Sequence, residues 1–356
     1  MSIRLAIHPF DRCGRLILRI LVERGLLSAS NGVTEPPIIL AAVSDQWQPE
    51  GLAHLLRHDS TYGPFPGMVE AVGDEAIAVN GLTIPFVEST LRFGSERSLP
   101  WGDLGVTHVI ENQPERLPSR RSAVHIESGA HKVLAAGHSG DDAVTLVMGV
   151  NHDRYDPSRH HVVSAALPTL TATGPILKVL NDSFGVDQGL LTHLRAYMTD
   201  LGLLDTAISG DRSRRCRAAA INVIPANRGY LQSLAWVLPE LTGKLHSHAF
   251  FVPSQAVSVL DLCVRLVKNT TVEEIHAALR EAAAGPAMHG ILDLSDEPLV
   301  SRDFLSCPAS CTVDTGLTQM LGGDFVKLVA WHDAEWAYAC RVVDVLRWML
   351  VAEGEM

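Results

Sequence analysis

The sequence has few charged residues and no long apolar run. Only 19% of its 356 residues are Asp, Glu, Lys or Arg, and 6% are aromatic. No apolar stretch is long enough to cross a membrane, and the segment from Ile3 to Ile7 is too short for a secretory signal before Pro9 interrupts it. The net charge of −11 is opposite to what nucleic acid or an anionic membrane attracts. We therefore expect a cytoplasmic protein with neither of these partners.

Paired cysteines are also lacking. The six cysteines contain no CxxC motif, and the looser pair Cys307 and Cys311 has no neighbouring histidine pair. This spacing argues against a zinc site and for free thiols in a reducing compartment. The sequence also contains no internal repeat and no low-complexity tract, so a solenoid or a disordered chain is not expected.

The sequence does contain an N-terminal β-α-β pattern in a chain long enough for two domains. A short buried strand is expected at residues 3–7, an amphipathic helix at about 15–25, and a second strand at 38–43. The second strand ends at Asp45, and an acidic residue at this point is typical of a dinucleotide-binding fold. Asp45 is interpreted either as a ribose ligand or as an ordinary turn carboxylate.

The turn between this strand and helix departs from the GxGxxG pattern. Its three glycine positions read Pro9, Asp11 and Gly14. Pro9 removes an N–H donor, and Asp11 brings a negative charge to the place where a diphosphate would lie. The turn therefore predicts weak dinucleotide binding or none.

The stretch Leu167–Thr173 joins a strand expected at 162–166 to a helix expected from 174. A strand that ends where a helix begins places free N–H groups at a cleft. The rest of the chain alternates less regularly, which indicates a mixed sheet backed by helices. A helix at 272–283, capped by Thr270 or Thr271, and a final helix at 336–349 complete the expected elements.

Several ordered motifs carry a resemblance to one family. They are Arg57–Gly63, Trp101–Asp103, Val147–Asp156, Asn222–Pro225, Pro239–Leu245, Val257–Leu262, Asp324–Trp331 and Arg341–Asp344. Along nearly its whole length the chain resembles glyceraldehyde-3-phosphate dehydrogenase. The resemblance implies an α/β fold with a Rossmann-like domain at 1–167, onto which a terminal helix at 334–356 packs, and an α+β catalytic-type domain with a mixed sheet at 168–333. It also implies a homotetramer or homodimer.

The family's catalytic positions do not match. Pro168 falls on the nucleophilic cysteine and Arg195 on the histidine that activates it. A proline has no nucleophile, and an arginine cannot act as a base near neutral pH. At the phosphate-binding positions Thr169 and Gly229 survive, whereas three positions change and the asparagine that orients the nicotinamide is lost. The replacements are Phe251, Met198, Arg228 and Ala334.

Four positions are candidates for a new anion site in this second half: Thr169, Arg195, Arg228 and Gly229. Arg195 either clamps a phosphate or carboxylate or forms an ion pair with Asp200 or Asp205. His193 lies two residues earlier, on the same face of a regular strand, so it is a candidate base, although a structural role is favoured. His193, Arg195 and Asp200 are thus the candidates for new chemistry. Pro168 is explained by structure alone, since it suits the first position of a helix.

Cofactor binding is implied by the resemblance but contradicted by the substitutions. Five positions remain that could still contact NAD or NADP: Phe10, Arg12, Gly14, Asp45 and Tyr338. The arginines from Arg212 to Arg217 match a loop that packs across a subunit interface in the family. No metal site is expected.

Three functions follow from these features. The first is a family member without phosphorylating dehydrogenase activity that binds a ligand or a partner. The second is a repurposed enzyme that acts on a small anionic molecule in the same cleft. The third is an NAD(P)-dependent aldehyde oxidoreductase retained with altered residues.

Overall fold

The computed structural model describes residues 3–27, 38–89, 99–112, 120–137, 143–199, 201–207, 213–226 and 233–356. The chain divides into two compact units. Unit 1 comprises residues 1–146, 152–166 and 339–356, and unit 2 comprises residues 147–151 and 167–338. Compared with the boundary expected after residue 167, a short segment at 147–151 and the first residues of the final helix join unit 2. No helix in the described part of the chain is long and apolar enough to span a membrane.

Unit 1 is built around a sheet that has nine strands in the described residues. Its order is β10-β11-β9-β8-β1-β2-β7-β6-β5, and the pairings are parallel from β10 to β7 and antiparallel from β7 to β5. The order reverses beside β1, which is typical of a doubly wound dinucleotide-binding fold. The strands are β1 (Ile3–His8), β2 (Ile38–Asp45), β5 (Val69–Val72), β6 (Ala76–Val79), β7 (Leu82–Glu88), β8 (His108–Glu111), β9 (Lys132–Ala135), β10 (Val144–Thr145) and β11 (Val162–Ser164), with a separate pair β3 (His58–Asp59) and β4 (Gly63–Pro64).

The helices of unit 1 are α1 (Arg12–Glu23), α2 (Pro49–Arg57), α3 (Arg120–Glu127), the 3₁₀ turn η1 (His152–Arg154) and most of α7 (Trp336–Ala352). Helix α1 begins three residues before the position expected from apolar spacing. The reason is local, because the Asp11 side chain accepts a hydrogen bond from the Gly14 N–H and so caps the helix at an earlier residue. Leu16, Ile17 and Ile20 on the inner face of α1 are buried.

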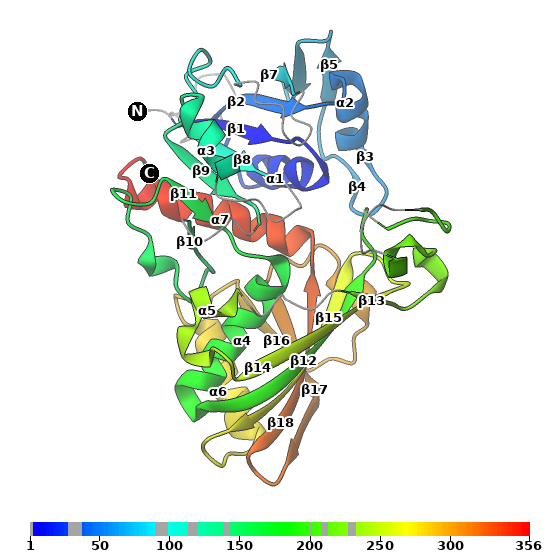
Figure 1. Ribbon diagram of the computed structural model, residues 1–356, viewed down its shortest axis with the longest axis vertical. Helices are drawn as coiled ribbons and strands as arrows, with labels where there is room; N and C mark the ends of the chain where they lie inside the picture. The colour runs from blue at the N-terminus through cyan, green and yellow to red at the C-terminus, as the bar shows by residue number, and fades with distance from the viewer. Residues whose placement is uncertain are drawn as a thin grey trace. The chain divides into compact units, whose positions relative to one another are not determined.

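The C-terminal helix α7 is held to the other elements of unit 1 by charged groups. Asp344 accepts a hydrogen bond at 2.6 Å from Arg24, the residue that follows α1, and pairs with Arg341 on its own helix at 2.6 Å. Just beyond the helix, Glu353 accepts from His108 on β8 at 2.9 Å and from the Tyr155 hydroxyl. Burial raises the pKa of Glu353, but these two hydrogen bonds outweigh it and hold the pKa below its usual value. Figure 1 shows α7 in red beside the strands of unit 1.

Replacing Glu353 by Gln is expected to lower the free energy of unfolding by about 1–2 kcal/mol. The substitution removes a charge that His108 and Tyr155 both hydrogen-bond, and hydrogen bonds to charged groups contribute about 1.5–3 kcal/mol each. Urea unfolding at pH 7 measures the change. Glu127→Gln is the matched control, because Glu127 is exposed at the end of α3. An equal effect of the two substitutions would contradict this account.

Unit 2 has a seven-stranded mixed sheet in its described residues, in the order β13-β14-β12-β15-β18-β17-β16. The strands β12/β14 and β16/β17 pair in parallel and the remaining neighbours antiparallel. This confirms the mixed sheet expected from the irregular pattern. The elements are β12 (Val186–Ala196), β13 (Ile224–Ala226), β14 (Leu245–Val252), β15 (Val257–Leu266), β16 (Leu292–Ser295), β17 (Cys311–Leu321), β18 (Phe325–Asp333), α4 (Pro168–Phe184), α5 (Leu234–Val237), α6 (Val272–Ala284) and the 3₁₀ turns η2 (Ser213–Cys216), η3 (Ala219–Ile221), η4 (Pro239–Leu241) and η5 (Ser301–Phe304).

Helices α4 and α6 pack against each other in unit 2, and α4 contacts β12 and β15 (Figure 1). Helix α4 begins at Pro168, six residues before the start expected from apolar spacing at residue 174. Pro168 takes the first helical position, which suits its fixed φ, so its missing N–H costs no intrahelical bond. Thr271, rather than Thr270, caps α6 in a full capping box with Glu274. Because α4 begins at Pro168, Thr169 lies in its first turn, where its hydroxyl is close to His193 on strand β12.

Candidate functional site

The turn between β1 and α1 is tightly packed. A Cβ added to Gly14 would lie 2.9 Å from the Pro9 carbonyl oxygen and 3.0 Å from Asn112 Nδ2. Asn112 Nδ2 also donates to the Pro9 carbonyl oxygen at 3.2 Å. The surviving glycine therefore allows the close helix–strand approach that this fold needs, even though the other two glycine positions have changed.

The charges at this turn are two carboxylates and one arginine. Burial raises the pKa of Asp11 to about 7, and nearby Asp45 adds to the rise, whereas the Gly14 N–H and Arg15 oppose it. Asp45 is 4% exposed, and its Oδ1 accepts from the backbone N–H groups of Gln46 and Trp47. Burial likewise raises the pKa of Asp45. The turn is therefore unfavourable for a second, external anion.

The other positions proposed for a cofactor have contacts of their own. Phe10 is fully buried. Arg12 pairs with Asp59 at 2.9 Å and lies 5.5 Å from the centre of the Tyr62 ring. Tyr338 is buried in α7. The burial of Phe10 and Tyr338 and the ion pair of Arg12 are compatible with a purely structural role for each of these residues.

A buried polar network lies close to the same end of the unit 1 sheet. Trp101 Nε1 donates to His125 Nδ1 at 2.9 Å, and Ser122 donates to Glu111 at 2.7 Å. His125 Nε2 lies 3.9 Å from Glu111, and burial lowers the pKa of His125 to about 4. The sequence motif at Trp101 is visible in the sequence. Its hydrogen bond to His125 is not, because the two residues are 24 positions apart and meet only in the fold.

The start of α4 and the strands of unit 2 bring together a threonine and two histidines. Thr169 Oγ1 lies 3.1 Å from His193 Nδ1, and His193 Nε2 lies 3.0 Å from His332 Nε2. All three side chains are buried, with exposures of 1–3%. Thr169 and His193 were among the sequence candidates, whereas His332 was not. The sequence held a signal for it, because His332 follows Val326, Leu328 and Ala330 at every second position of β18, and all four are buried.

The two imidazoles are neutral near pH 7. Burial lowers the pKa of His332 to about 3, with Arg195 adding to the effect, and burial also lowers the pKa of His193 well below its usual value. A neutral imidazole has one donor and one acceptor nitrogen. Because the two Nε2 atoms face each other, one must donate, and the choice decides whether the Thr169 hydroxyl accepts from His193 or donates to it.

Arg195 lies on the same face of β12 as His193, as the sequence predicts, and both are buried. Its guanidinium lies 5.1 Å from the centre of the Phe251 ring, and that of Arg215 lies 5.4 Å from the same ring. Arg195 Nη2 also donates to Met198 Sδ at 3.3 Å. Two guanidinium groups and the Thr169–His193–His332 chain thus occupy one region of unit 2.

Some sequence candidates have other partners or lie outside the description. Asp205, proposed to pair with Arg195, pairs with Arg217 at 3.2 Å, because both extend from the exposed segment beyond β12. Three candidates, Asp200, Arg228 and Gly229, lie outside the described residues. All six cysteines lie in the described residues, and none is part of a disulfide bond. The described residues contain no cluster of histidine, cysteine and carboxylate side chains suited to a metal ion.

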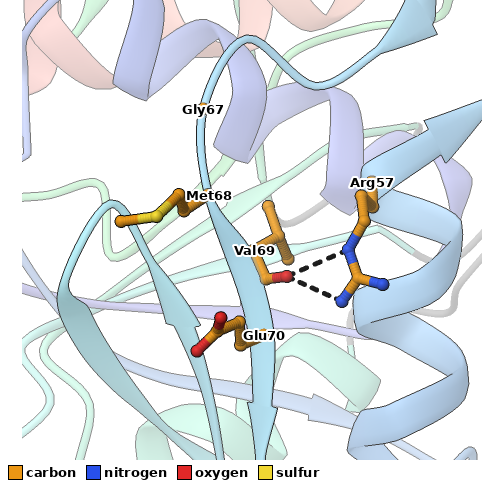
Figure 2. Close-up of a pocket in the computed structure, with 5 residues that line it drawn as sticks. All are labelled: Arg57, Gly67, Met68, Val69 and Glu70. Carbon is orange, nitrogen blue, oxygen red and sulfur yellow. Dashed lines mark hydrogen bonds between the residues drawn. The ribbon is translucent and has the colours of Figure 1, made fainter.

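Figure 2 shows a surface cavity of about 380 Å³ elsewhere in unit 1. Arg57 crosses toward the neighbouring strand and donates to the Val69 carbonyl oxygen at 2.7 and 3.0 Å. Gly67, Met68 and Glu70 complete the lining. None of the sequence candidates that the structure describes lines this cavity.

The two units have the architecture of a dinucleotide-binding domain and a mixed-sheet catalytic domain. Residues 3–116 match the sequence model of the glyceraldehyde 3-phosphate dehydrogenase NAD binding domain, and residues 169–334 match that of the C-terminal domain. The chain is 38% identical to glyceraldehyde-3-phosphate dehydrogenase of Geobacillus stearothermophilus, covering 97% of both chains. It is 40% identical to glyceraldehyde-3-phosphate dehydrogenase 2 of Trichormus variabilis over 99% of both chains. It is also 40% identical to the chloroplastic A form of Zea mays, over 97% of this chain and 81% of the maize protein.

The chain belongs to the glyceraldehyde-3-phosphate dehydrogenase family. Its fold confirms the expected Rossmann-like unit and α+β unit.

Proposed function

We propose that this protein has lost the phosphorylating dehydrogenase reaction of its family. The observation that carries the proposal is the start of α4, where Pro168 is the first residue. The family resemblance places the nucleophilic cysteine at this position. Without a thiol at this position no covalent thioester can form there. Arg195 at the histidine position keeps its proton near neutral pH and cannot activate a nucleophile. On this proposal the protein acts through binding rather than through turnover.

The neighbouring histidines do not supply a substitute base of ordinary strength. His193 reaches Thr169 Oγ1, but burial and the proximity of His332 and Arg195 lower the pKa of His193 well below its usual value. A general base works best when its pKa lies near the working pH. A neutral imidazole in this setting accepts hydrogen bonds but gains a proton only at considerable cost.

The activity is tested on the purified full-length chain with NAD, glyceraldehyde 3-phosphate and inorganic phosphate. The Geobacillus stearothermophilus relative serves as the positive control. We expect kcat/KM to be lower by at least about 10⁴-fold, because loss of a catalytic nucleophile removes covalent catalysis and leaves only binding contributions. A value of kcat/KM within tenfold of that of the control would overturn the proposal.

A second candidate function is an enzyme that acts on a small anionic molecule in unit 2. Arg195 and Arg215 favour it, because both guanidinium groups lie beside Phe251 and close to the Thr169–His193 pair. Guanidinium groups recognise phosphate and carboxylate by paired hydrogen bonds. The candidate predicts that inorganic phosphate raises the melting temperature of the wild-type chain and that Arg195→Gln removes most of this shift. Retention of the full shift in Arg195→Gln would exclude Arg195 from anion binding.

The proposal also covers the oligomeric state of the protein and its cellular compartment. We infer a homotetramer or homodimer in the cytoplasm, in which the segment around Arg215 and Arg217 contacts another copy. The family resemblance and the exposed apolar side chains of Leu203, Leu204 and Ile221 in this segment support it. Sedimentation velocity of the purified chain measures the state, and a monomer at micromolar concentration would contradict it.

A further inference from the structure

The backbone of the β1–α1 turn keeps the path of a diphosphate-binding turn, although its composition has changed. Gly14 still allows the closest approach of α1 to β1, with no room for a Cβ beside the Pro9 carbonyl oxygen. The first turn of α1 therefore keeps its place at the carboxyl end of the strands, next to Asp45 at the end of β2. If this turn binds a dinucleotide differently from a GxGxxG turn, the cause must be its side chains and the backbone N–H groups that they already hydrogen-bond.

Most of the donors that such a turn offers are already used. Pro9 has no N–H. The Phe10 N–H donates to the Ser44 carbonyl oxygen at 2.7 Å, and the Gly14 N–H donates to Asp11 Oδ1 at 3.0 Å. An anion at a helix N-terminus is stabilised by these free N–H groups and by the helix dipole. Here the carboxylate of Asp11 takes that place from within the chain.

The charged groups around Asp11 come from three elements. Arg15 lies one turn along α1, Asp45 ends β2, and the Arg12–Asp59 pair joins α1 to β3. Arg15 Nη1 donates to the Phe10 carbonyl oxygen at 3.3 Å, while its buried Nε has no hydrogen-bond partner among the described residues. The Arg15 guanidinium thus interacts with three carboxylates, those of Asp11, Asp59 and Asp45, and its buried Nε–H remains an available donor.

We propose that the Asp11 side chain is an internal anion that occupies the phosphate position at the N-terminus of α1 and excludes dinucleotides from unit 1. The inference deepens the proposed function, on which it rests, by naming the residue that blocks the cofactor. It also makes the exclusion dependent on pH. Burial raises the pKa of Asp11 to about 7, so the carboxyl loses its charge as the pH falls below 7. An anion bound at the turn below pH 7 would then lie near Asp45 and Arg15 but would not be repelled by a charge on Asp11.

The test compares NAD binding by the full-length wild type, Asp11→Asn and Asp11→Gly, measured by isothermal titration calorimetry at pH 8. Asparagine caps a helix as well as aspartate does, so Asp11→Asn removes the charge and leaves the cap. We expect both variants to bind NAD at least tenfold more tightly than the wild type, since like charges a few ångströms apart repel strongly even at surface-like dielectric. Asp74→Asn, at an exposed turn of unit 1, is the matched control and is expected to bind like the wild type.

The pH arm uses the same titration at pH 6, where the diphosphate of NAD carries the same charge as at pH 8. Wild-type affinity is expected to increase several-fold from pH 8 to pH 6, and Asp11→Asn is expected to show no such increase. If neither Asp11 variant binds NAD more tightly than the wild type, the inference is wrong while the proposed loss of activity stands. If the wild type itself binds NAD tightly at pH 8 and reduces it with glyceraldehyde 3-phosphate, both are wrong.

Discussion

Acidification from pH 7 to pH 4 is expected to destabilise unit 2 by about 3 kcal/mol through His332 alone, since each pH unit between the two pKa values contributes about 1.4 kcal/mol per proton. The imidazole is 3% exposed, and burial lowers its pKa from 6.5 to about 3. The folded pKa is below the unfolded one, so the unfolded state binds the extra proton in this window. The stability is therefore complete above pH 6.5 and is lost as the pH falls toward 3. His193 changes in the same direction.

Unit 1 is expected to be less sensitive over the same range. Burial lowers the pKa of His125 to about 4, which also costs stability in acid. Asp11 acts in the opposite direction, because its folded pKa of about 7 lies above that of the unfolded chain. The folded state therefore gains a proton at Asp11 as the pH falls from 7 to 4, and this gain offsets much of the loss at His125. Acid is expected to open unit 2 before unit 1.

Native-state hydrogen exchange between pH 7 and pH 4 distinguishes the two units, once the intrinsic exchange rates are corrected for pH. Amides of β12 and β18 should lose protection faster than those of β1 and β8. His332→Gln should flatten the pH dependence of unit 2, because glutamine can hydrogen-bond His193 but does not titrate. His289→Gln is the control, since His289 is exposed. The explanation is wrong if His332→Gln and the wild type lose equal stability over this range.

Replacing Trp101 by Ala is expected to lower the free energy of unfolding by about 4 kcal/mol, within the range for large-to-small changes at buried aromatic residues. The indole is fully buried, and many of its buried neighbours are small: Ala6, Ala41, Ala42 and Ala130. Short side chains cannot move in to fill the space, so most of the cavity would persist. The substitution also removes the donor to His125 Nδ1, which leaves a buried acceptor without its partner.

Trp101→Phe separates the two causes. Phenylalanine keeps much of the buried volume but lacks the indole N–H, so its cost should be about 1–3 kcal/mol, the range for an unsatisfied buried group. Urea unfolding followed by far-UV circular dichroism measures both variants at pH 7. Trp47→Ala provides a control at a tryptophan that is 67% exposed. A loss below about 1 kcal/mol for Trp101→Ala would show that the site collapses around the missing ring.

The candidate site could be predicted from sequence only where its signals are local. The position of Pro168 at the start of α4 follows from its fixed φ angle and missing N–H. The cap of α6 was expected at Thr270 or Thr271, and the structure places it at Thr271. The common face of His193 and Arg195 follows from the alternation of a strand. Each of these features depends on neighbours in the chain, so the sequence located them to within a few residues.

The sequence by itself determined the family, the N-terminal β-α-β unit and the absence of a nucleophile at residue 168. Only the tertiary structure decided which side chains meet. His193 and His332 are 139 residues apart, and they come into contact because β12 pairs with β15 and β15 with β18 in one particular register. The same holds for the Asp11, Arg15 and Asp45 group, which requires β1, α1 and β2 to meet at one end of a sheet. Caps and alternation are set within a few residues, whereas burial and the pKa values that follow from it depend on packing between distant strands.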